Sequence, residues 1–559
     1  MLYYVVMKVH ISRITKRYKG KTYVCPLLVH SYRDENGKPR NKTILNLSVL
    51  PEHALEALDA ALREGKNGKR YNKEDIQYDT SLPVGDVWSV HKLSKDVGLA
   101  DVLQKVLNKQ DAGMVLAMIY DRVVSPKPHS KRALYEMIDK TLVPRLVGFS
   151  KKPPQIEWYR VLERLYSKQK LLEKQLYVDI GERVFLYDIT STYFEGDHCP
   201  IAEFGYNRDG KKGKKQVIVG LMTRGDGCPI AVEVFKGGTS DQTTVSGQIT
   251  RLKKEFRVKN LVFIGDRGMV TSTRIDEIES EAVERRTDYI TALQRQEMMK
   301  LVKDINHPLQ LELFDEKDIA EVDYEGRRYM LCHNPFRKEN DAQTRQRLMA
   351  LTEEKLQAIK RNVANGRLKR RDAIAKRLYK WIDRWGMEKF FEYEFDEGKF
   401  IYTVNLANLE RYIRLDGCYV IITSLNKHDM DKDEVVERYK SLAQVEQAFR
   451  SMKTEDLNVR PIRHWNEKRV RGHIFMCVLA YRLVWEARIR LKTFLASKNT
   501  PSGSLRDIWE CLSRISLGRF RIGSVFVEQL GSINKKQREV IKALRVKLTH
   551  KLLSQEINH

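Results

Sequence analysis

The most regular hydrophobic pattern lies between residues 183 and 293, where short apolar runs alternate with polar segments. Three successive strands are predicted by the runs RVFLYDI, KQVIVGLM and PIAVEVFK, with a hairpin turn at TRGDG between the last two. A polar helix at about 243–257 follows, then the apolar run NLVFIGD, a short helix and the strand DYITAL. The predicted order is β, β, β, α, β, α, β, which indicates a mixed sheet.

The first 182 residues show two other patterns. Residues 1–65 predict a small β-rich module, in which two strand-like runs flank DENGKPR and a short helix, EHALEALDAALREG, follows. Asn36-Gly37 within that link is typical of a β-hairpin turn. Residues 66–182 carry apolar side chains at helical spacing, as in GLADVLQKVL and AGMVLAMIYDRVV, and predict a mostly helical region.

Residues 295–414 are expected to interrupt the sheet. AEVDYEGRRYMLC and FFEYEFDEGKFIYTV predict hairpins turning at 324–326 and 396–398, and a helical hairpin between them turns at Asn365-Gly366. The strand GCYVIITS then returns the chain to the core. The expected fold class is therefore α/β: a mixed-sheet core in two parts, 183–294 and 415–493, an α+β insertion, the β-rich module, and flanking helical regions that include a basic helical segment at 494–559.

The net charge of the chain indicates the kind of partner that it binds. The chain has 101 Lys and Arg against 74 Asp and Glu, a net charge of +27, and a pI of about 9.6. Such an excess favours a polyanionic partner, either nucleic acid or an acidic membrane face. Residues 360–380 hold nine Lys and Arg and one acid, Asp372, and form either a solvated helix face or a contact to phosphates.

Membrane and extracellular locations are not expected. The longest apolar run, IFMCVLAYRLVW, contains Arg482 and falls short of the roughly 18 residues of a membrane span, so it predicts a buried helix. The seven cysteines are odd in number and form no CxxC pair, which favours a reducing compartment over a zinc site or a disulfide framework. The first residues, MLYYVVMKVHISR, lack the pattern of a signal peptide.

Two aspartates suggest chemistry, because Asp188 and Asp266 each follow an apolar run in adjacent predicted strands. One such residue alone is typically a turn or cap residue. Two carboxylates brought close repel each other unless a proton or a metal ion neutralises them. Mg²⁺ prefers a few carboxylates together with phosphate oxygens. The pair in a basic chain therefore predicts metal-assisted phosphoryl transfer on nucleic acid. By contrast, Asp209 and Asp226 lie in glycine turns and need no functional explanation.

A third acid is expected from the helix YKSLAQVEQAFRSMK. Tyr439, Glu446 and Lys453 are spaced by seven residues, nearly two turns, so a continuous helix would place all three on one face. An apolar stripe lies beside that face, formed by Leu442, Val445, Phe449 and Met452. Glu446 is therefore expected at the edge of the core-facing side.

The order of these motifs resembles the DDE transposases of bacterial insertion sequences, in the large subgroup with an insertion between the second Asp and the Glu. Further blocks resemble the family in the same order: FGYNRDGKKGKKQVIVGLM, KGGTSD, GDRGMVT and RPIRHWNEKRVRGHIFMCVLAYRL. The family motif carries an Arg three residues after the Tyr, where this chain has Leu442.

The resemblance implies an RNase H-like core that cleaves DNA at transposon ends and transfers the strand into target DNA, in cut-and-paste movement. It implies two Mg²⁺ ions, for which Mn²⁺ can substitute, held by Asp188, Asp266 and Glu446. Contacts to DNA would come from Tyr439, Lys453, Arg450 and Arg267. The implied partners are double-stranded DNA, both terminal inverted repeats and target, and a second copy of the chain in a synaptic homodimer. Residues 66–182 and the basic C-terminal segment would help bind DNA in the bacterial cytoplasm.

Two alternatives stay open. An RNase H-like nuclease would cut without joining strands, and a catalytically inactive DNA-binding protein would bind without cutting. The missing Arg at 442 favours the second alternative, whereas the three acids favour an enzyme. Trp381 and Trp385 of the insertion either stack on a displaced base or pack within the helical hairpin.

Overall fold

The computed structural model of the 559-residue chain describes residues 8–18, 21–63, 76–206, 208–279, 287–303, 319–324, 326–496, 504–522, 525–550 and 552–553. The predicted domain boundary at 65/66 and Glu325 of a predicted turn lie outside these residues. The chain forms two compact units. Unit 1 comprises residues 1–181, 189–239 and 444–559, and unit 2 comprises 182–188 and 240–443.

A mixed sheet of eight strands occupies the middle of the sequence, in the order β10-β11-β14-β9-β8-β5-β6-β7. Its strands are β5 (Val184–Tyr193), β6 (Gln216–Arg224), β7 (Pro229–Phe235), β8 (Val262–Gly265), β9 (Asp288–Ala292), β10 (Ile319–Tyr324), β11 (Arg327–His333) and β14 (Cys418–Thr423). Strands β5, β8 and β9 pair in parallel, and β6 pairs antiparallel with β7. The predicted α/β class is confirmed.

The predicted order of elements is also confirmed, because the chain runs β5, β6, β7, α9 (Val245–Lys254), β8, α10 (Ser272–Glu279), β9. A single 3₁₀ turn, η3 (Asp241–Thr244), precedes α9. Parallel neighbours cannot be joined by a tight turn, and the segment containing α10 joins the parallel neighbours β8 and β9. The segment containing α9 carries the chain from β7, at one end of the strand order, back to β8 beside β5.

The first hairpin of the expected insertion belongs to the sheet instead. Strand β10 pairs antiparallel with β11, β11 with β14, and β14 with β9. The expectation that the core sheet stops at residue 294 and resumes at 415 is therefore wrong for this hairpin. The hairpin joins the sheet because β11 forms hydrogen bonds with β14, some ninety residues later in the chain. A local sequence pattern cannot predict such a distant pairing. Helix α11 (Arg295–Lys303) lies between β9 and β10 in sequence.

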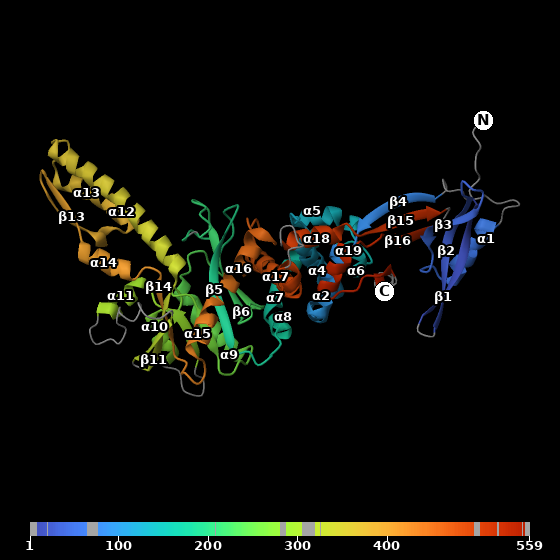
Figure 1. Cartoon of the computed structure of the whole chain (residues 1–559), viewed down its shortest axis with the longest axis horizontal. Helices are drawn as coiled ribbons and strands as arrows, with labels where there is room; N and C mark the ends of the chain where they lie inside the picture. The colour runs from blue at the N-terminus through green and yellow to red at the C-terminus, as the bar shows by residue number, and fades with distance from the viewer. Residues whose placement is uncertain are drawn as a thin grey trace. The chain divides into compact units, whose positions relative to one another are not determined.

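The rest of the expected insertion forms an arm with its own small core. The arm consists of α12 (Pro335–Ala364), α13 (Arg371–Trp385), η6 (Glu388–Phe390), β12 (Phe391–Asp396), β13 (Lys399–Val404) and α14 (Leu406–Arg414). Helices α12 and α13 lie side by side, with β13 against α12 (Figure 1). Leu356, Ile374, Leu378 and Ile382 are fully buried between them. Trp381 and Trp385 are partly buried against this core, as the packing alternative expects.

The N-terminal module folds as the pattern predicts, with one strand more. Strands β1 (Lys8–Tyr18), β2 (Lys21–Arg33) and β3 (Pro39–Asn46) form an antiparallel sheet, followed by α1 (Glu52–Arg63). The predicted hairpin turn joins β2 to β3, where Gly37 has φ +74° and the Asp34 carboxylate accepts hydrogen bonds from the backbone N–H groups of Asn36 and Lys38.

The expected helical region follows strand β4 (Ile76–Pro83). Its helices are α2 (Gly85–Asp96), α3 (Leu99–Val106), α4 (Lys109–Val124), α5 (Lys131–Met137), η2 (Ile138–Lys140), α6 (Val143–Leu146), α7 (Glu157–Ser167) and α8 (Gln169–Leu176). The long helix α17 (Glu467–Ala496) contains the predicted apolar run and is buried along Ile474–Leu479. A Cβ at Gly472 would lie 2.0 Å from the Leu162 carbonyl oxygen, so α17 packs backbone to backbone on α7.

The C-terminal segment is not wholly helical, contrary to expectation. Between α18 (Leu505–Ser513) and α19 (Lys535–Ala543) it forms the hairpin β15 (Ser516–Ile522) and β16 (Val525–Leu530), and β15 pairs with β4. The alternation in SLGRFRI is a strand signal that was available in the sequence. Its partner β4 lies more than 400 residues earlier. In the part of the chain that the structure describes, no helix has both the length and the hydropathy to cross a membrane.

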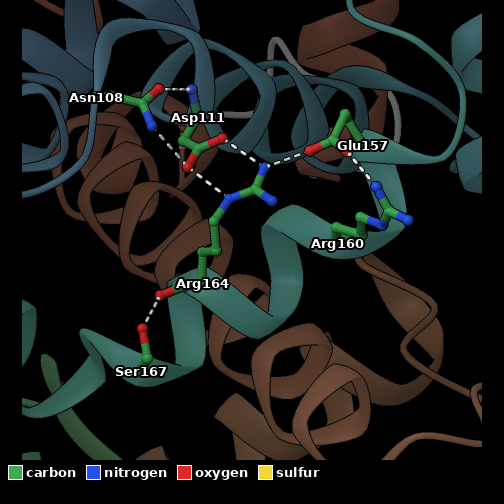
Figure 2. A network of polar contacts seen from close by, with 6 residues as sticks. All are labelled: Asn108, Asp111, Glu157, Arg160, Arg164 and Ser167. Carbon is green, nitrogen blue, oxygen red and sulfur yellow. Dashed lines mark hydrogen bonds and ion pairs between the residues drawn. The ribbon is translucent and has the colours of Figure 1, made fainter.

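A charged network joins α4 to α7 (Figure 2). Arg164 donates two hydrogen bonds of 2.7 Å to the carboxylate of Asp111, and a third, of 2.9 Å, to Glu157. Asn108 caps α4 by accepting from the Asp111 backbone N–H, and its amide donates to the Asp111 carboxylate. The Asp111 side chain is 6% exposed, and it raises the pKa of the Arg164 guanidinium.

Asp111→Ala should loosen this contact, because it leaves the fork of Arg164 without its main acceptor. We expect a loss of about 2 kcal/mol of local stability, in the range of hydrogen bonds to charged groups. Hydrogen exchange of peptides from α4 and α7 measures it. Glu136→Gln is the matched control, since its ion pair with Arg132 is 59% and 73% exposed and should leave exchange unchanged. Equal exchange in both variants would contradict the assignment.

Candidate active site

Asp188 and Asp266 are brought to neighbouring positions in unit 2. The parallel register of β5 and β8 ends at Tyr187 opposite Gly265, and the two aspartates are the next residues on their strands. Paired strands run about 4.8 Å apart, so the two aspartates occupy adjacent backbone positions at the end of this pairing. Asp188 is half-buried and Asp266 is exposed. The sequence prediction that these acids lie in adjacent strands is confirmed.

The sequence pattern predicts that Asp188 ends its strand, and this prediction is wrong. Asp188 is the fifth of ten residues in β5, and the strand continues through Ile189 to Tyr193. That continuation is rich in β-branched residues, which favour extended backbone. Backbone hydrogen bonds hold it, from Phe194 N–H to the Lys215 carbonyl (2.9 Å) and from Ile462 N–H to the Tyr193 carbonyl (3.2 Å). Asp188 is the one acid in β5, whose other residues are buried except Tyr193. The parallel pairing with β8 ends beside Asp188, whereas the strand continues.

The turn after β8 fixes Asp266. Its backbone carbonyl accepts hydrogen bonds from Met269 N–H (2.9 Å) and Val270 N–H (3.2 Å), which closes the turn in GDRGMVT. Val270 folds back onto the strand end, where a Cβ at Gly265 would lie 2.8 Å from its Cγ2 atom. Gly265 is therefore required for the close return of this turn, and the turn sets the direction in which Asp266 leaves the sheet.

Glu446 belongs to unit 1, and the continuous helix predicted around it is wrong. The segment divides into α15 (Lys432–Lys440), α16 (Ala443–Arg450) and a π-helical turn, η7 (Ser451–Glu455). Leu442 N–H bonds to the Tyr439 carbonyl three residues back (3.1 Å), and the Ser441 hydroxyl donates to the Arg438 carbonyl. Such a tightened turn and a competing serine end a helix. Tyr439, Glu446 and Lys453 therefore do not share the face of one helix.

Helix α16 leaves Glu446 exposed at the flank of its buried side, which is formed by Val445, Ala448 and Phe449. A turn of the β6–β7 hairpin packs against its start, since a Cβ at Gly227 would lie 2.3 Å from the Gln444 side-chain oxygen. Glu446 is exposed. The predicted position beside an apolar stripe is thus retained over this shorter helix.

The four predicted DNA-contacting residues differ in their surroundings. Arg267 and Arg450 are exposed, and Tyr439 is half-buried at the end of α15. Lys453 is only 13% exposed and donates a 2.8 Å hydrogen bond to Asp209, whose glycine turn predicts no functional role. The available signal was the block FGYNRDGKKGKK, which places this acid between Arg208 and the cationic run KKGKK.

The donor set at the paired strands fits a divalent metal ion. Carboxylate oxygens are the ligands that Mg²⁺ takes in proteins, and a divalent cation offsets the repulsion between two acids that lie close together. Within the described residues, no group of three or more His, Cys, Asp or Glu side chains is gathered closely enough to hold a metal ion. The structure therefore brings together the pair Asp188 and Asp266, and it describes Glu446 within the other unit.

The chain matches two family models. Residues 179–483, more than half of the chain, match the family model described as the transposase DDE domain. The chain therefore belongs to the DDE-domain transposases, and its function lies in DNA transposition. Residues 11–75 match the N-terminal domain of IS1634 family transposases, which covers the β-rich module. The resemblance seen in the sequence is confirmed.

Other comparisons add less. No curated protein matches the chain in sequence at a significant level. Among solved structures, a cryo-EM structure of piggyBac transposase in a synaptic complex with hairpin DNA matches over 85% of each chain, at 8% identity and a TM-score of 0.35. A likeness at that TM-score carries no argument about this chain.

Gly265→Ala should strain the Asp266 turn, because the added methyl meets Val270 at 2.8 Å. Overpacking of this kind costs about 1–3 kcal/mol. We expect a lower thermal midpoint, and Val270→Ala in the same chain should restore much of it by making room. Gly268→Ala in the same turn is the control, since its Cβ would meet no atom within 4 Å. A loss at Gly268 equal to that at Gly265 would show that the turn, not the contact, is sensitive.

Proposed function

We propose that the protein cleaves DNA at the ends of its mobile element and transfers the freed strand into target DNA, with Asp188, Asp266 and Glu446 as the acidic residues. The observation that carries the proposal is the placement of Asp188 and Asp266 at the end of the β5–β8 pairing. Membership of the DDE-domain family supports it, since residues 179–483 span all three acids.

The residues have distinct tasks in this mechanism. Asp188 and Asp266 supply oxygen ligands from the sheet, where hydrogen-bonded strands keep their separation fixed, and Glu446 supplies the third carboxylate. These carboxylates would hold a divalent metal ion, which would supply activation of water or of a DNA 3′-hydroxyl and neutralisation of charge at the leaving oxygen. The exposed guanidinium groups of Arg267 and Arg450 bind phosphate oxygens beside the reacting strand.

The partners follow from this reaction. Double-stranded DNA is bound at the terminal inverted repeats and at the target, and a net charge of +27 supports binding to a polyanion. Two copies of the chain act together on paired ends as a homodimer. Basic residues of 66–182 and 494–559 contribute to recognition of the ends, and the reaction takes place on bacterial DNA in the cytoplasm.

Glu446→Gln and Asp188→Asn should each lower cleavage of an end-bearing duplex by at least about 100-fold, because each removes one charged ligand. Binding of the same duplex should persist. Chelation by EDTA should stop cleavage by the parent protein, and added Mg²⁺ or Mn²⁺ should restore it. Glu437→Gln is the control, as an exposed acid on the neighbouring helix α15.

The products separate the three candidate functions. Joined strands from a 3′-hydroxyl donor end support the transposase. Cleavage without joining identifies a nuclease, and binding without cleavage identifies an inactive DNA-binding protein. Unchanged cleavage by Glu446→Gln would show that the third acid is wrongly assigned.

The arm supplies a second, separate contact to DNA in this proposal. The exposed side of its helical hairpin is rich in cations: Arg361, Arg367, Lys369, Arg370, Arg371, Lys376, Arg377 and Lys380. Three cations surround one indole, because Lys355, Lys380 and Arg384 lie 5.6, 5.1 and 5.6 Å from the Trp381 ring. A polyanion would be attracted to this group of cations, of which Lys355 is already paired with Glu354 at 2.7 Å.

Replacing Arg370, Lys376 and Arg377 together by Gln should weaken duplex binding and flatten its salt dependence, since up to three phosphate contacts are lost. Glutamine keeps helix propensity close to that of the replaced residues. Fluorescence anisotropy over a series of salt concentrations measures both effects. Lys399→Gln on the same arm is the control, because Lys399 already pairs with Glu394 at 2.7 Å. An unchanged salt slope in the triple variant would assign these cations to a solvated face.

A further inference from the structure

Asp209 forms a buried ionic cluster with two cations in unit 1. Its carboxylate accepts a 2.8 Å hydrogen bond from the Lys453 ammonium, and the same oxygen pairs with the Arg460 guanidinium. The Asp209 side chain is 2% exposed, against 13% for Lys453 and 22% for Arg460. One carboxylate thus lies beneath two cations whose outer edges reach solvent.

The loop that carries Asp209 is anchored to the sheet. The Arg208 backbone N–H donates a 3.0 Å hydrogen bond to the hydroxyl of Ser191, which is fully buried on β5 three residues after Asp188. The Gln216 side chain, at the start of β6, donates to the Tyr206 carbonyl at 3.1 Å. The position of Asp209 is therefore set by the central strands and not by a mobile turn.

The two cations come from one folded-back segment after α16. The backbone N–H groups of Asp456 and Leu457 both bond to the Ser451 carbonyl at 3.1 Å, which closes the π turn. Val459 N–H then bonds to the Met452 carbonyl at 2.9 Å, so the chain returns and Arg460 lies beside Lys453. The side chain of Arg122 caps the segment by donating to the Leu457 and Asn458 carbonyls.

The Asp209 carboxylate offsets part of the positive charge of Lys453 and Arg460. Burial lowers the pKa of the Lys453 ammonium, the nearby Arg460 and Arg208 lower it further, and the Asp209 carboxylate opposes the shift. Two cations that share one carboxylate retain one net positive charge. Without that carboxylate, two nearly buried like charges would stand together, which is costly. A phosphate group is an anion whose oxygens can accept hydrogen bonds from both cations at once.

We propose that Asp209 is a positioning residue that holds Lys453 and Arg460 as a two-cation clamp for one phosphate group of the bound DNA strand. This inference rests on the proposed function, because it takes the phosphate to be that of a DNA end. It extends the assignment of Lys453 by adding Arg460 as its partner and Asp209 as the group that orients both.

The test is equilibrium binding of a short duplex taken from the DNA flanking the gene, in EDTA, over a series of salt concentrations. Lys453→Ala should weaken binding about tenfold and reduce the salt slope by about one phosphate. Asp209→Asn should reproduce that loss of slope, and the double variant should bind no more weakly than Lys453→Ala alone, because the two residues act through one contact. Arg460→Ala should show the same coupling to Asp209.

Glu195→Gln is the matched control, because Glu195 also pairs with a lysine, Lys214, at 2.8 Å, but at 39% exposure. It should leave the slope unchanged. Thermal midpoints are measured for every variant. If Asp209→Asn does not fold, additive losses from Lys453→Ala and Arg460→Ala would overturn the clamp, and non-additive losses would support it.

Three results overturn the proposal in a folded Asp209→Asn protein. Tighter binding would show that Asp209 competes with phosphate for the cations, an unchanged slope would show a purely structural role, and additive losses would separate Asp209 from Lys453. If the parent protein does not prefer the flanking duplex over a scrambled one, the proposed function fails instead. The two failures are therefore distinguishable.

Discussion

The parallel pairing of β5 with β8 is the constraint on which the candidate active site depends. Its register ends at Tyr187 and Gly265, so the next residues along the chain, Asp188 and Asp266, occupy adjacent positions. Parallel neighbours need a long connection, and the segment containing α9 provides it. Everything proposed for the chemistry follows from holding two carboxylates at adjacent strand positions, where their mutual repulsion calls for a cation.

Nearly buried acids that pair with cations are a second feature of the structure. The chain as a whole is strongly basic, and in two of its ionic contacts a nearly buried acid holds cations in place. Asp111 orients Arg164 in the helical region, and Asp209 holds Lys453 and Arg460 after α16. In each case the acid is almost fully buried and the cation keeps an exposed edge. A hydrogen bond to a buried carboxylate fixes the direction of the cationic side chain. Such pairs can therefore order the cations of a basic surface.

Local sequence patterns predicted much of the fold. The order β5, β6, β7, α9, β8, α10, β9, the turn at Gly37, the helical hairpin of the arm and the adjacency of Asp188 and Asp266 all follow from periodicity and turn residues. Other features were not predicted: the break between α15 and α16, the continuation of β5 beyond Asp188, the hairpin β15–β16, and the attachment of β10–β11 to the sheet. A serine hydroxyl bonded to its own helix ends α15, and pairing across long stretches of sequence places the two hairpins.

The sequence alone determined the α/β class, the family-like order of acids and the polyanionic partner, because these depend on residue types and short-range spacing. Only the tertiary structure decided what surrounds Lys453. In the sequence, Asp209 has the pattern of an ordinary turn residue. In the structure, Ser191 anchors its loop and the segment 451–460 folds back, so that Lys453 and Arg460 lie next to it. Burial of a charge, and the identity of its partner, are properties of packing between segments 244 residues apart, which no local pattern encodes.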